Sequence, residues 1–290
     1  MKPPWHGRES AIVALTCTPP ISICGAVVNR RIIMIHSWRT FTTVVLGLVA
    51  VLLLCFAGSV QADAAAAKQK LRVVVFGGHP DDPESGAGGL VAMLTRAGHE
   101  VICAYGTSFR GDRKINGEPE GVVRRREATA ACKLLNATPK FFDYAHEKLF
   151  ADGPTLEAVR AWLDEVKPDI VVAHWPLDMH PNHHVVSSLV WQCYKRSGVW
   201  NLYFFEVETD MQSISFRPEL YLDIEGVRDL KKQALDCHAS QHPDDIWKLH
   251  DAMHCRRGTE CGVRHAEAYW LVEAKPGVPL LPVTFIGPKK

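Results

Sequence analysis

Two short segments rich in histidine and aspartate contain the residue types that a metal-dependent hydrolase needs. The first reads His-Pro-Asp-Asp at 79–82, and the second, at 174–183, reads His-Trp-Pro-Leu-Asp-Met-His-Pro-Asn-His. A hydrolytic metal centre uses a few imidazoles and carboxylates as ligands and leaves one position open for water. It also needs a nearby carboxylate that accepts the proton of that water. The two adjacent aspartates of the first segment can divide these tasks. His180 and His183 can likewise divide into a ligand and a free imidazole that stabilises an oxyanion or protonates a leaving amine.

Both segments follow apolar stretches that are typical of buried parallel strands. The pattern predicts strands at 71–76, 101–105, near 141, at 169–174 and at 201–207, and helices at 88–97, 122–135, 155–166 and 183–196. This alternation predicts an α/β fold with a Rossmann-like, doubly wound, mostly parallel sheet and helices on both faces. Because such sheets bind ligands at the carboxyl ends of their strands, we expect the two segments to share one edge.

The same four letters occur again at 242–245, in a different context. They follow a helical stretch at 227–237 and have no buried strand before them. We interpret this second copy as the start of a helix, with Asp244 or Asp245 near its N-terminus. His-Pro-Asp-Asp is therefore weak evidence on its own, and the strand and the partner segment give the first copy its meaning.

The first 62 residues read as a targeting segment. An apolar run at 44–60 follows Arg39, and Val-Gln-Ala at 60–62 resembles the cleavage site of a signal peptide. We expect a signal peptide at 34–62, cleaved after Ala62, which predicts export to the periplasm or the extracellular space. An uncleaved membrane anchor at 44–60 is the alternative. The remainder, 68–290, is expected to form one domain.

Net charge and cysteine content indicate which partners and which compartment to expect. A formal net charge of +1 gives no indication of a nucleic-acid partner. Nine cysteines fit an exported protein, and Cys255 and Cys261 are close enough in sequence to close a disulfide loop, although the sequence leaves the pairing open. The oligomeric state is likewise left open.

Together these residues resemble the PIG-L/LmbE family of zinc-dependent N-acetylglucosaminyl deacetylases. The resemblance covers Leu71 to about Val272. The matching segments are 78–84 with the glycines at 88–89, the R-x-x-E of Arg124 and Glu127, 174–183, His-Ala-Ser-Gln at 238–241 and Ala-Glu-Ala at 266–268.

The resemblance implies a role for each site residue. The implied zinc ligands are His79, Asp82 and His183. Asp81 would be the general base, and His180 would stabilise the oxyanion or protonate the departing amine. Asp178 would orient an imidazole. Arg124 would face the substrate, with a solvated helix charge as the alternative.

Other histidines and two departures from the family pattern complete the candidate site. His174 and His184 are interpreted as structural. Asn182 stands where relatives carry an aspartate, which could alter the pKa of His180 or His183 without removing a ligand. Arg110 stands in the loop after the second strand where many relatives place glutamate, which predicts a different substrate.

The expected activity is removal of an N-acetyl group from an amino sugar or glycoconjugate, with release of acetate and a free amine. Two alternatives stay open: an amidase that cleaves another acyl amide or a thiol conjugate, and a catalytically silent sugar-binding homologue. A nucleotide-binding Rossmann protein is excluded, because the glycine fingerprint is missing after the strand at 71–76.

Overall fold

A computed structural model describes residues 70–197, 199–208 and 211–289. The expected signal peptide at 34–62 and the alternative anchor at 44–60 lie outside the described residues. Within the described part of the chain, no helix is both long enough and apolar enough to cross a membrane.

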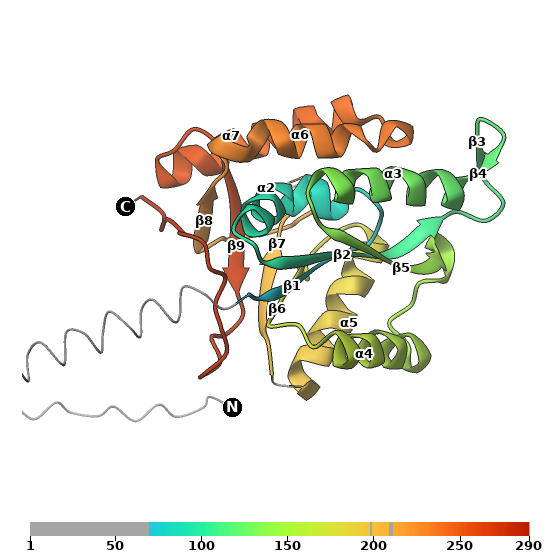
Figure 1. Cartoon of the computed structure of the whole chain (residues 1–290), viewed down its shortest axis with the longest axis horizontal. Helices are drawn as coiled ribbons and strands as arrows, with labels where there is room; N and C mark the ends of the chain where they lie inside the picture. The colour runs from blue at the N-terminus through green and yellow to red at the C-terminus, as the bar shows by residue number, and fades with distance from the viewer. Residues whose placement is uncertain (1–69, 198, 209–210, 290) are drawn as a thin grey trace, which may run out of the picture. The chain divides into compact units, whose positions relative to one another are not determined.

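A seven-stranded sheet forms the centre of the described chain (Figure 1). Its strands are β1 (Arg72–Gly77), β2 (Glu100–Phe109), β5 (Thr138–Ala145), β6 (Ile170–His174), β7 (Asn201–Phe205), β8 (Leu220–Asp223) and β9 (Ala266–Leu271). They lie in the order β5-β2-β1-β6-β7-β9-β8. The first five are parallel, and β9 runs antiparallel to both β7 and β8. A separate two-stranded hairpin consists of β3 (Lys114–Ile115) and β4 (Glu118–Pro119).

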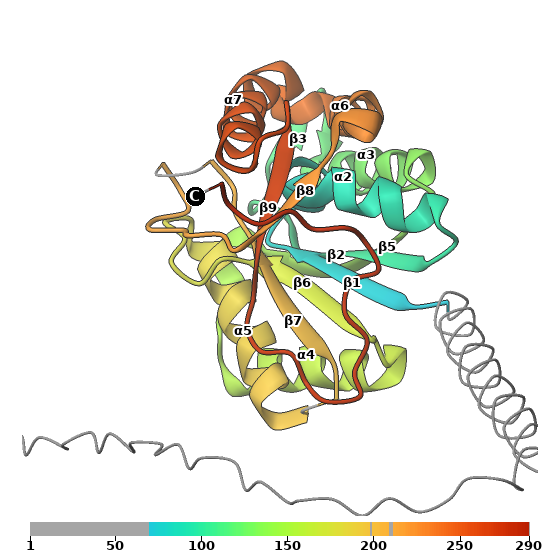
Figure 2. The same cartoon turned by 90° about the vertical axis from the view of Figure 1, so that its left-hand side faces the viewer.

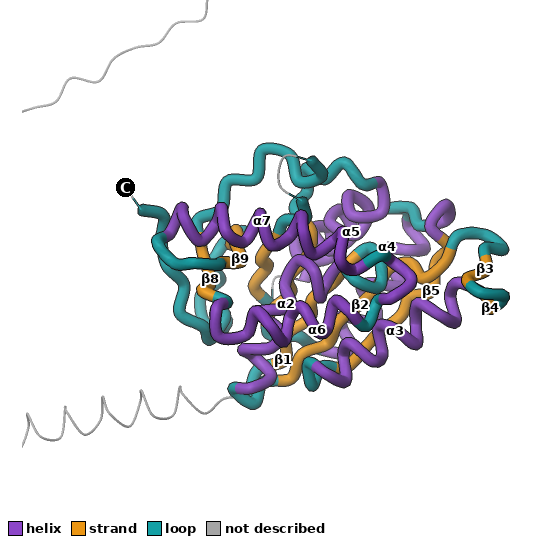
Figure 3. Tube along the Cα trace, turned by 90° about the horizontal axis from the view of Figure 1, so that it is seen from above, coloured by secondary structure: helices purple, strands orange, loops and turns teal. Residues whose placement is uncertain are grey.

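Helices cover both faces of this sheet (Figure 2). One face carries α2 (Asp82–Arg96), α3 (Glu120–Leu134), α6 (Arg228–Asp236) and α7 (Pro243–Cys261), which Figure 3 shows from above. The opposite face carries α4 (Gly153–Val166) and α5 (Pro181–Ser197). The predicted fold class, a doubly wound and mostly parallel α/β sheet, is therefore confirmed.

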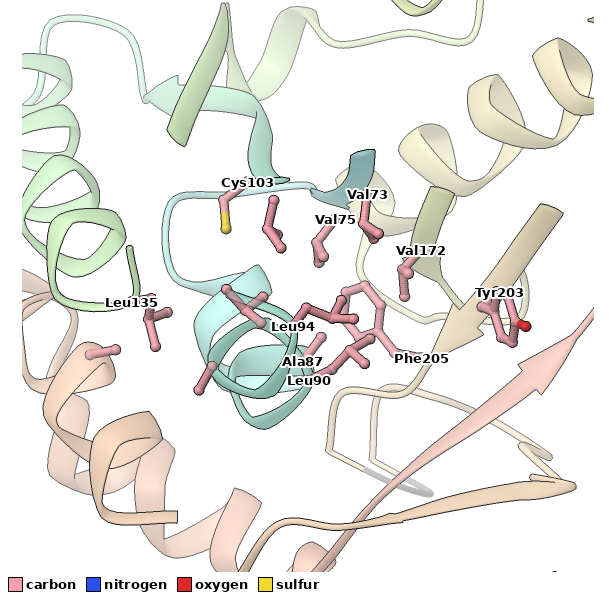
Figure 4. Packing of buried hydrophobic residues seen from close by; sticks show 14 of the residues in the cluster. Val73, Val75, Ala87, Leu90, Leu94, Cys103, Leu135, Val172, Tyr203 and Phe205 are labelled. Atoms are coloured by element: carbon pink, nitrogen blue, oxygen red, sulfur yellow. The ribbon is translucent and has the colours of Figure 1, made fainter. Parts of the chain in front are cut away.

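Alternation along β1 divides the apolar core into two layers. Val73 and Val75 pack with Leu90 and the other apolar residues of α2 (Figure 4). Val74 and Phe76 point the other way and join the cluster that includes Val190 of α5. Because both faces are covered, every residue of this strand can be apolar, which explains why the sequence shows an unbroken run.

Helix α2 begins at Asp82, six residues before the expected start at Gly88. Glycine has a low helix propensity, so the glycine-rich stretch after Asp82 was not predicted to be helical. The packing requires small residues here, because a Cβ at Gly86 would collide with the ring of Phe205. The helix is also kinked at Ala87, whose φ of −135° is not helical.

Two glutamates, the buried Glu267 and the half-buried Glu127, hold the helices near the site. Glu267 of β9 accepts hydrogen bonds from the backbone N–H groups of Gly89 (2.7 Å) and Leu90 (2.8 Å), next to the kink of α2. It also pairs with the buried Lys231 of α6 at 2.6 Å. Glu127 of α3 accepts hydrogen bonds from both the backbone N–H and the hydroxyl of Ser240. These are residues of the R-x-x-E, His-Ala-Ser-Gln and Ala-Glu-Ala segments, so the weaker signatures hold the scaffold together.

The six cysteines of the described chain are all unpaired. Cys255 and Cys261 both lie on α7, six positions apart on one helix. The short disulfide loop that the sequence left open is therefore absent from the structure.

Candidate metal centre

The two histidine-rich segments meet at the centre of the sheet. Strands β1 and β6 are hydrogen-bonded neighbours, and the order of the parallel strands reverses between them. Figure 2 shows the two strands side by side in the middle of the sheet. Such a reversal opens a crevice at the carboxyl ends of the strands, where ligands bind in doubly wound folds. Segments 79–82 and 174–183 both begin at this crevice.

The three expected zinc ligands form a compact triangle of donor atoms. His79 Nδ1 lies 3.1 Å from His183 Nε2 and 3.3 Å from Asp82 Oδ2, and His183 Nε2 lies 3.2 Å from that same oxygen. Ligand atoms about 2.0 Å from a tetrahedral zinc ion lie about 3.3 Å from one another. The donor set therefore matches one face of a zinc tetrahedron in both chemistry and size.

Electrostatics at the triangle also favour a bound cation. Burial would lower the pKa of His183, but the carboxylates of Asp82 and Asp178 outweigh burial and raise it to about 10. Burial likewise opposes ionisation of Asp82, yet the surrounding imidazoles of His183, His174 and His79 hold its pKa well below the usual range. The site thus stabilises positive charge at the centre of the triangle.

A second layer of side chains orients the candidate ligands. Asp178 Oδ1 lies 3.2 Å from Nδ1 of His183, so the expectation that Asp178 contacts an imidazole matches its position. The other oxygen of Asp178 accepts a hydrogen bond from Ser213, 3.3 Å away. His174 stacks on His183 with ring centroids 3.9 Å apart, and its Nε2 lies 3.1 Å from Asp82 Oδ2. His174 is thus buried against the ligands, whereas His184 is exposed and outside the site.

The side chain of Asn182 contacts a candidate ligand in the first segment. Its amide lies 3.1 Å from Nε2 of His79, whereas only the backbone N–H of Asn182 contacts His180. The side-chain contact with His79 adds a partner that the sequence did not predict. If Nδ1 of His79 faces a metal, Nε2 carries the proton and donates it, so the amide must present its oxygen.

Asp81 occupies a strained position between the triangle and α3. Its φ of 134° is unfavourable for any residue with a side chain and costs about 1–3 kcal/mol. Arg124 holds the turn, because its Nη2 donates to the carbonyl of Pro80 at 2.7 Å and lies 3.3 Å from Asp81 Oδ1. The turn keeps Asp81 out of the triangle while Asp82 enters it. Burial raises the pKa of Asp81 to about 7, although Arg124 opposes that shift.

Arg124 is buried, unlike the next two arginines of α3. Arg125 and Arg126 are surface residues that pair with Asp143 and Glu118. Arg124 therefore does not have the solvated position that was the alternative. It reaches the cavity wall and also positions Asp81.

A cavity of about 180 Å³ opens over the triangle. It is lined by the predicted residues His79, Asp81, Asp82, Arg124, His180 and His183, and by Arg110, His146, Glu208, Gln212, Gln241 and His250 among others. Sequence reasoning missed His146 and His250. His146 follows β5 in a single helical turn, and His250 lies within α7, so neither belongs to a motif. Only the folding of distant segments around the cavity reveals them.

Comparison with known proteins places this architecture in a family. Residues 74–194 match the family model PIG-L, described as GlcNAc-PI de-N-acetylase. The 4-oxalmesaconate hydratase of Pseudomonas putida is 30% identical over 208 residues, covering 64% of this chain and 80% of that protein. The chain belongs to the PIG-L family.

Other PIG-L relatives differ in their named reactions. A protein of Bacillus subtilis named probable N-acetyl-alpha-D-glucosaminyl L-malate deacetylase 2 is 24% identical, covering 69% of this chain and 97% of that protein. The crystal structure of the 4-carboxy-2-hydroxymuconate hydratase of Pseudomonas putida matches with a TM-score of 0.63 at 25% identity. That match covers 73% of this chain and 100% of the other. The PIG-L fold thus supports more than one reaction, and the site must decide between them.

Proposed function

We propose that the protein is a zinc-dependent N-deacetylase that removes the N-acetyl group of an amino-sugar substrate and releases acetate and a free amine. The observation that carries the proposal is the triangle of His79, Asp82 and His183 with Asp81 beside it. The family model and the deacetylase relative support the same reaction.

The side chains around the triangle can divide the work of amide hydrolysis. A zinc ion held by the three ligands would lower the pKa of a water molecule and polarise the acyl carbonyl. Asp81 would accept the proton of the attacking water at its carboxylate. Arg124 keeps that carboxylate in position through Pro80 and through its ion pair.

His180 is placed to act on the substrate oxygen or the departing amine. The backbone N–H of Asn182 donates to His180 Nδ1 at 3.3 Å, so the neutral ring carries its proton on Nε2. His180 lines the cavity beside His79 and His183. An N–H donor in that position can stabilise the oxyanion, and the proton that Asp81 takes from the water can then pass to the amine, directly or by way of His180.

The test is acetate release from a panel of N-acetylated sugars by the purified protein. We expect one zinc per chain, turnover of at least one sugar, loss of turnover with a chelator and recovery when zinc is returned. Iron and cobalt should be tried in parallel, because the ligand types do not select zinc alone. If the fully zinc-loaded protein releases no acetate from any sugar, the proposal is wrong.

A second candidate reaction is the addition of water to a carbon–carbon double bond. The 30% identical relative, which is named a hydratase, is the observation that favours it. Hydration has no leaving amine and therefore needs no acetyl group. Loss of the absorbance of a conjugated unsaturated polycarboxylate, without release of acetate, would replace the deacetylase proposal with this one.

We also propose that residues 34–62 direct export of the enzyme. The sequence pattern at 44–62 supports this proposal. N-terminal sequencing of protein from fractionated cells should find the chain beginning at Asp63 outside the cytoplasm. A full-length chain in the membrane fraction would indicate the uncleaved anchor instead.

A further inference from the structure

Arg110 brings a positive charge into the wall of the catalytic cavity. It lies in the loop that follows β2 and lines the same space as Asp81, His180 and the metal triangle.

Two glutamates fix the backbone that presents Arg110. The backbone N–H of Arg110 donates to Glu120 Oε2 at 2.7 Å, and Glu120 is itself buried. The next N–H, that of Gly111, donates to Glu147 Oε1 at 3.0 Å. Gly111 has a φ of +45°, a conformation that glycine adopts readily. These two hydrogen bonds position the backbone at Arg110 beside the cavity.

The side chain of Arg110 is exposed to solvent at the cavity wall, and its guanidinium group has no carboxylate partner among the described residues. Its Nε donates to Nδ1 of His146 at 3.2 Å, and its two terminal nitrogens make no hydrogen bond or ion pair within the described chain. The charges nearer the triangle are compensated, because Arg124 pairs with Asp81 and imidazoles surround Asp82. Glu208, which also lines the cavity, accepts a hydrogen bond from the neutral amide of Gln212 at 2.7 Å and is not an ion-pair partner of Arg110.

His146 adds a neutral donor beside this charge. Because Arg110 donates to Nδ1, the neutral ring carries its proton on Nε2. That Nε2 is buried and has no hydrogen-bond partner within the described chain. A buried donor without a partner in a cavity wall indicates a ligand atom that completes it.

We propose that the substrate carries an anionic group, a carboxylate or a phosphate, which binds Arg110 at the cavity wall beside His146. This inference rests on the proposed deacetylase function and narrows its substrate to acidic N-acetylated amino sugars. The two terminal nitrogens of a guanidinium fit two oxygens of either anion, and such charge-assisted pairs are the stronger hydrogen bonds of proteins.

The experiment compares three N-acetylated sugars that differ in charge. N-acetylglucosamine is neutral, N-acetylmuramic acid carries a carboxylate, and N-acetylglucosamine 6-phosphate carries a phosphate. For each sugar, kcat/KM for acetate release and the dissociation constant by calorimetry are measured with the zinc-loaded protein. The two acidic arms distinguish a carboxylate from a phosphate.

Three variants test whether a preference for an acidic sugar depends on Arg110. The wild type should favour one acidic sugar over the neutral sugar by about 10- to 100-fold, the effect of a hydrogen bond to a charged group. Arg110→Gln should reduce that ratio to near one, and Arg110→Lys should give an intermediate ratio because it keeps only a point charge. Arg126→Gln is the matched control, because Arg126 is exposed on α3 and pairs with Glu118 outside the cavity.

The outcomes separate the inference from the function on which it rests. If all three sugars release acetate equally and bind equally, the inference is wrong while the deacetylase function stands. An acidic preference that is unchanged in Arg110→Gln would also overturn it. If no sugar releases acetate, the proposed function fails, and the calorimetric comparison still decides whether Arg110 selects anions.

Discussion

The chain contains His-Pro-Asp-Asp twice, and both copies lead into a helix, but only the first brings its side chains to the metal triangle. At 79–82 the segment follows a buried strand, and its side chains gather at the cavity. At 242–245 it starts α7, where His242 has a φ of 56° and Pro243 opens the helix. Asp244 and Asp245 are exposed there and pair with Lys232 and Lys248. The interpretation of the second copy as a helix start is confirmed.

Context explains the difference in physical terms. In the first copy the irregular residue is the third, Asp81, so the two aspartates diverge and only Asp82 enters the triangle. In the second copy the irregular residue is the first, so both aspartates lie in the first turn of the helix, where negative charge is favourable. Four letters thus specify a metal site only when a buried strand and a facing histidine segment surround them.

The largest contrast is expected at the fourth position of each copy. Asp82→Ala removes a ligand and leaves buried imidazoles without their carboxylate, so we expect zinc binding and acetate release to be lost. Asp245→Ala changes the same letter on the exposed helix and should keep both. Zinc content by mass spectrometry and turnover decide the comparison. Full zinc occupancy in Asp82→Ala would show that the ion binds elsewhere.

The third position separates chemistry from binding. Asp81→Ala should retain zinc, because Asp81 lies outside the triangle, and should lower kcat by about 10²- to 10⁴-fold through loss of the general base. Asp244→Ala should leave both quantities near the wild type. Near-native kcat in Asp81→Ala would mean that another group accepts the proton of the water.

Much of this contrast was predictable from the sequence. The apolar runs before 79 and 174 predicted parallel strands, and the rule on strand ends predicted that their loops meet. By contrast, β8 and β9 were not predicted, since they are antiparallel strands whose partners are set by tertiary contacts. The start of α2 was also missed, because close packing of Gly86 against Phe205 outweighs the low helix propensity of glycine.

The residues of the cavity wall were less predictable than the candidate metal ligands. His146 and His250 are single histidines without a motif, and they reach the cavity from the turn after β5 and from α7, outside both histidine-rich segments. The contact between Asn182 and His79 was likewise not predicted, because the turn into α5 directs the amide across the crevice and spacing along the sequence does not show this.

A smaller effect is expected from a substitution in the segment at 174–183, which faces the first copy and has no counterpart beside the second. Asp178→Asn removes the carboxylate charge that lies 3.2 Å from Nδ1 of His183. Carboxylates that orient a metal-bound histidine contribute about 10- to 100-fold in metal affinity. We expect zinc affinity to fall within that range, measured by competition with a chromophoric chelator. Ser213→Ala, which removes only the hydroxyl that donates to Asp178, should weaken affinity less.

Asn182→Asp tests how strongly a residue of the segment at 174–183 affects zinc binding by His79 in the first copy. A carboxylate beside Nε2 of His79 would accept its proton more strongly than an amide oxygen and raise the basicity of Nδ1. We therefore expect zinc affinity to rise, by about tenfold at most, in the same competition assay. Asn182→Ser, which shortens the side chain, should lower it. An unchanged affinity in both variants would show that the amide does not contribute to the orientation of His79.

The smallest effect is expected from removing the charges of the second copy altogether. Asp244→Ala/Asp245→Ala removes two acids from the first turn of α7 together with their exposed ion pairs, which contribute little in water. The melting temperature should fall by a few degrees at most, while zinc content and acetate release stay at the wild-type level. The neighbouring Gln241 and Ile246 line the cavity, so a shift of this helix start would become visible in KM. A loss of zinc in the double variant would contradict the distinction between the two copies, because it would make residues 242–245 part of the metal centre.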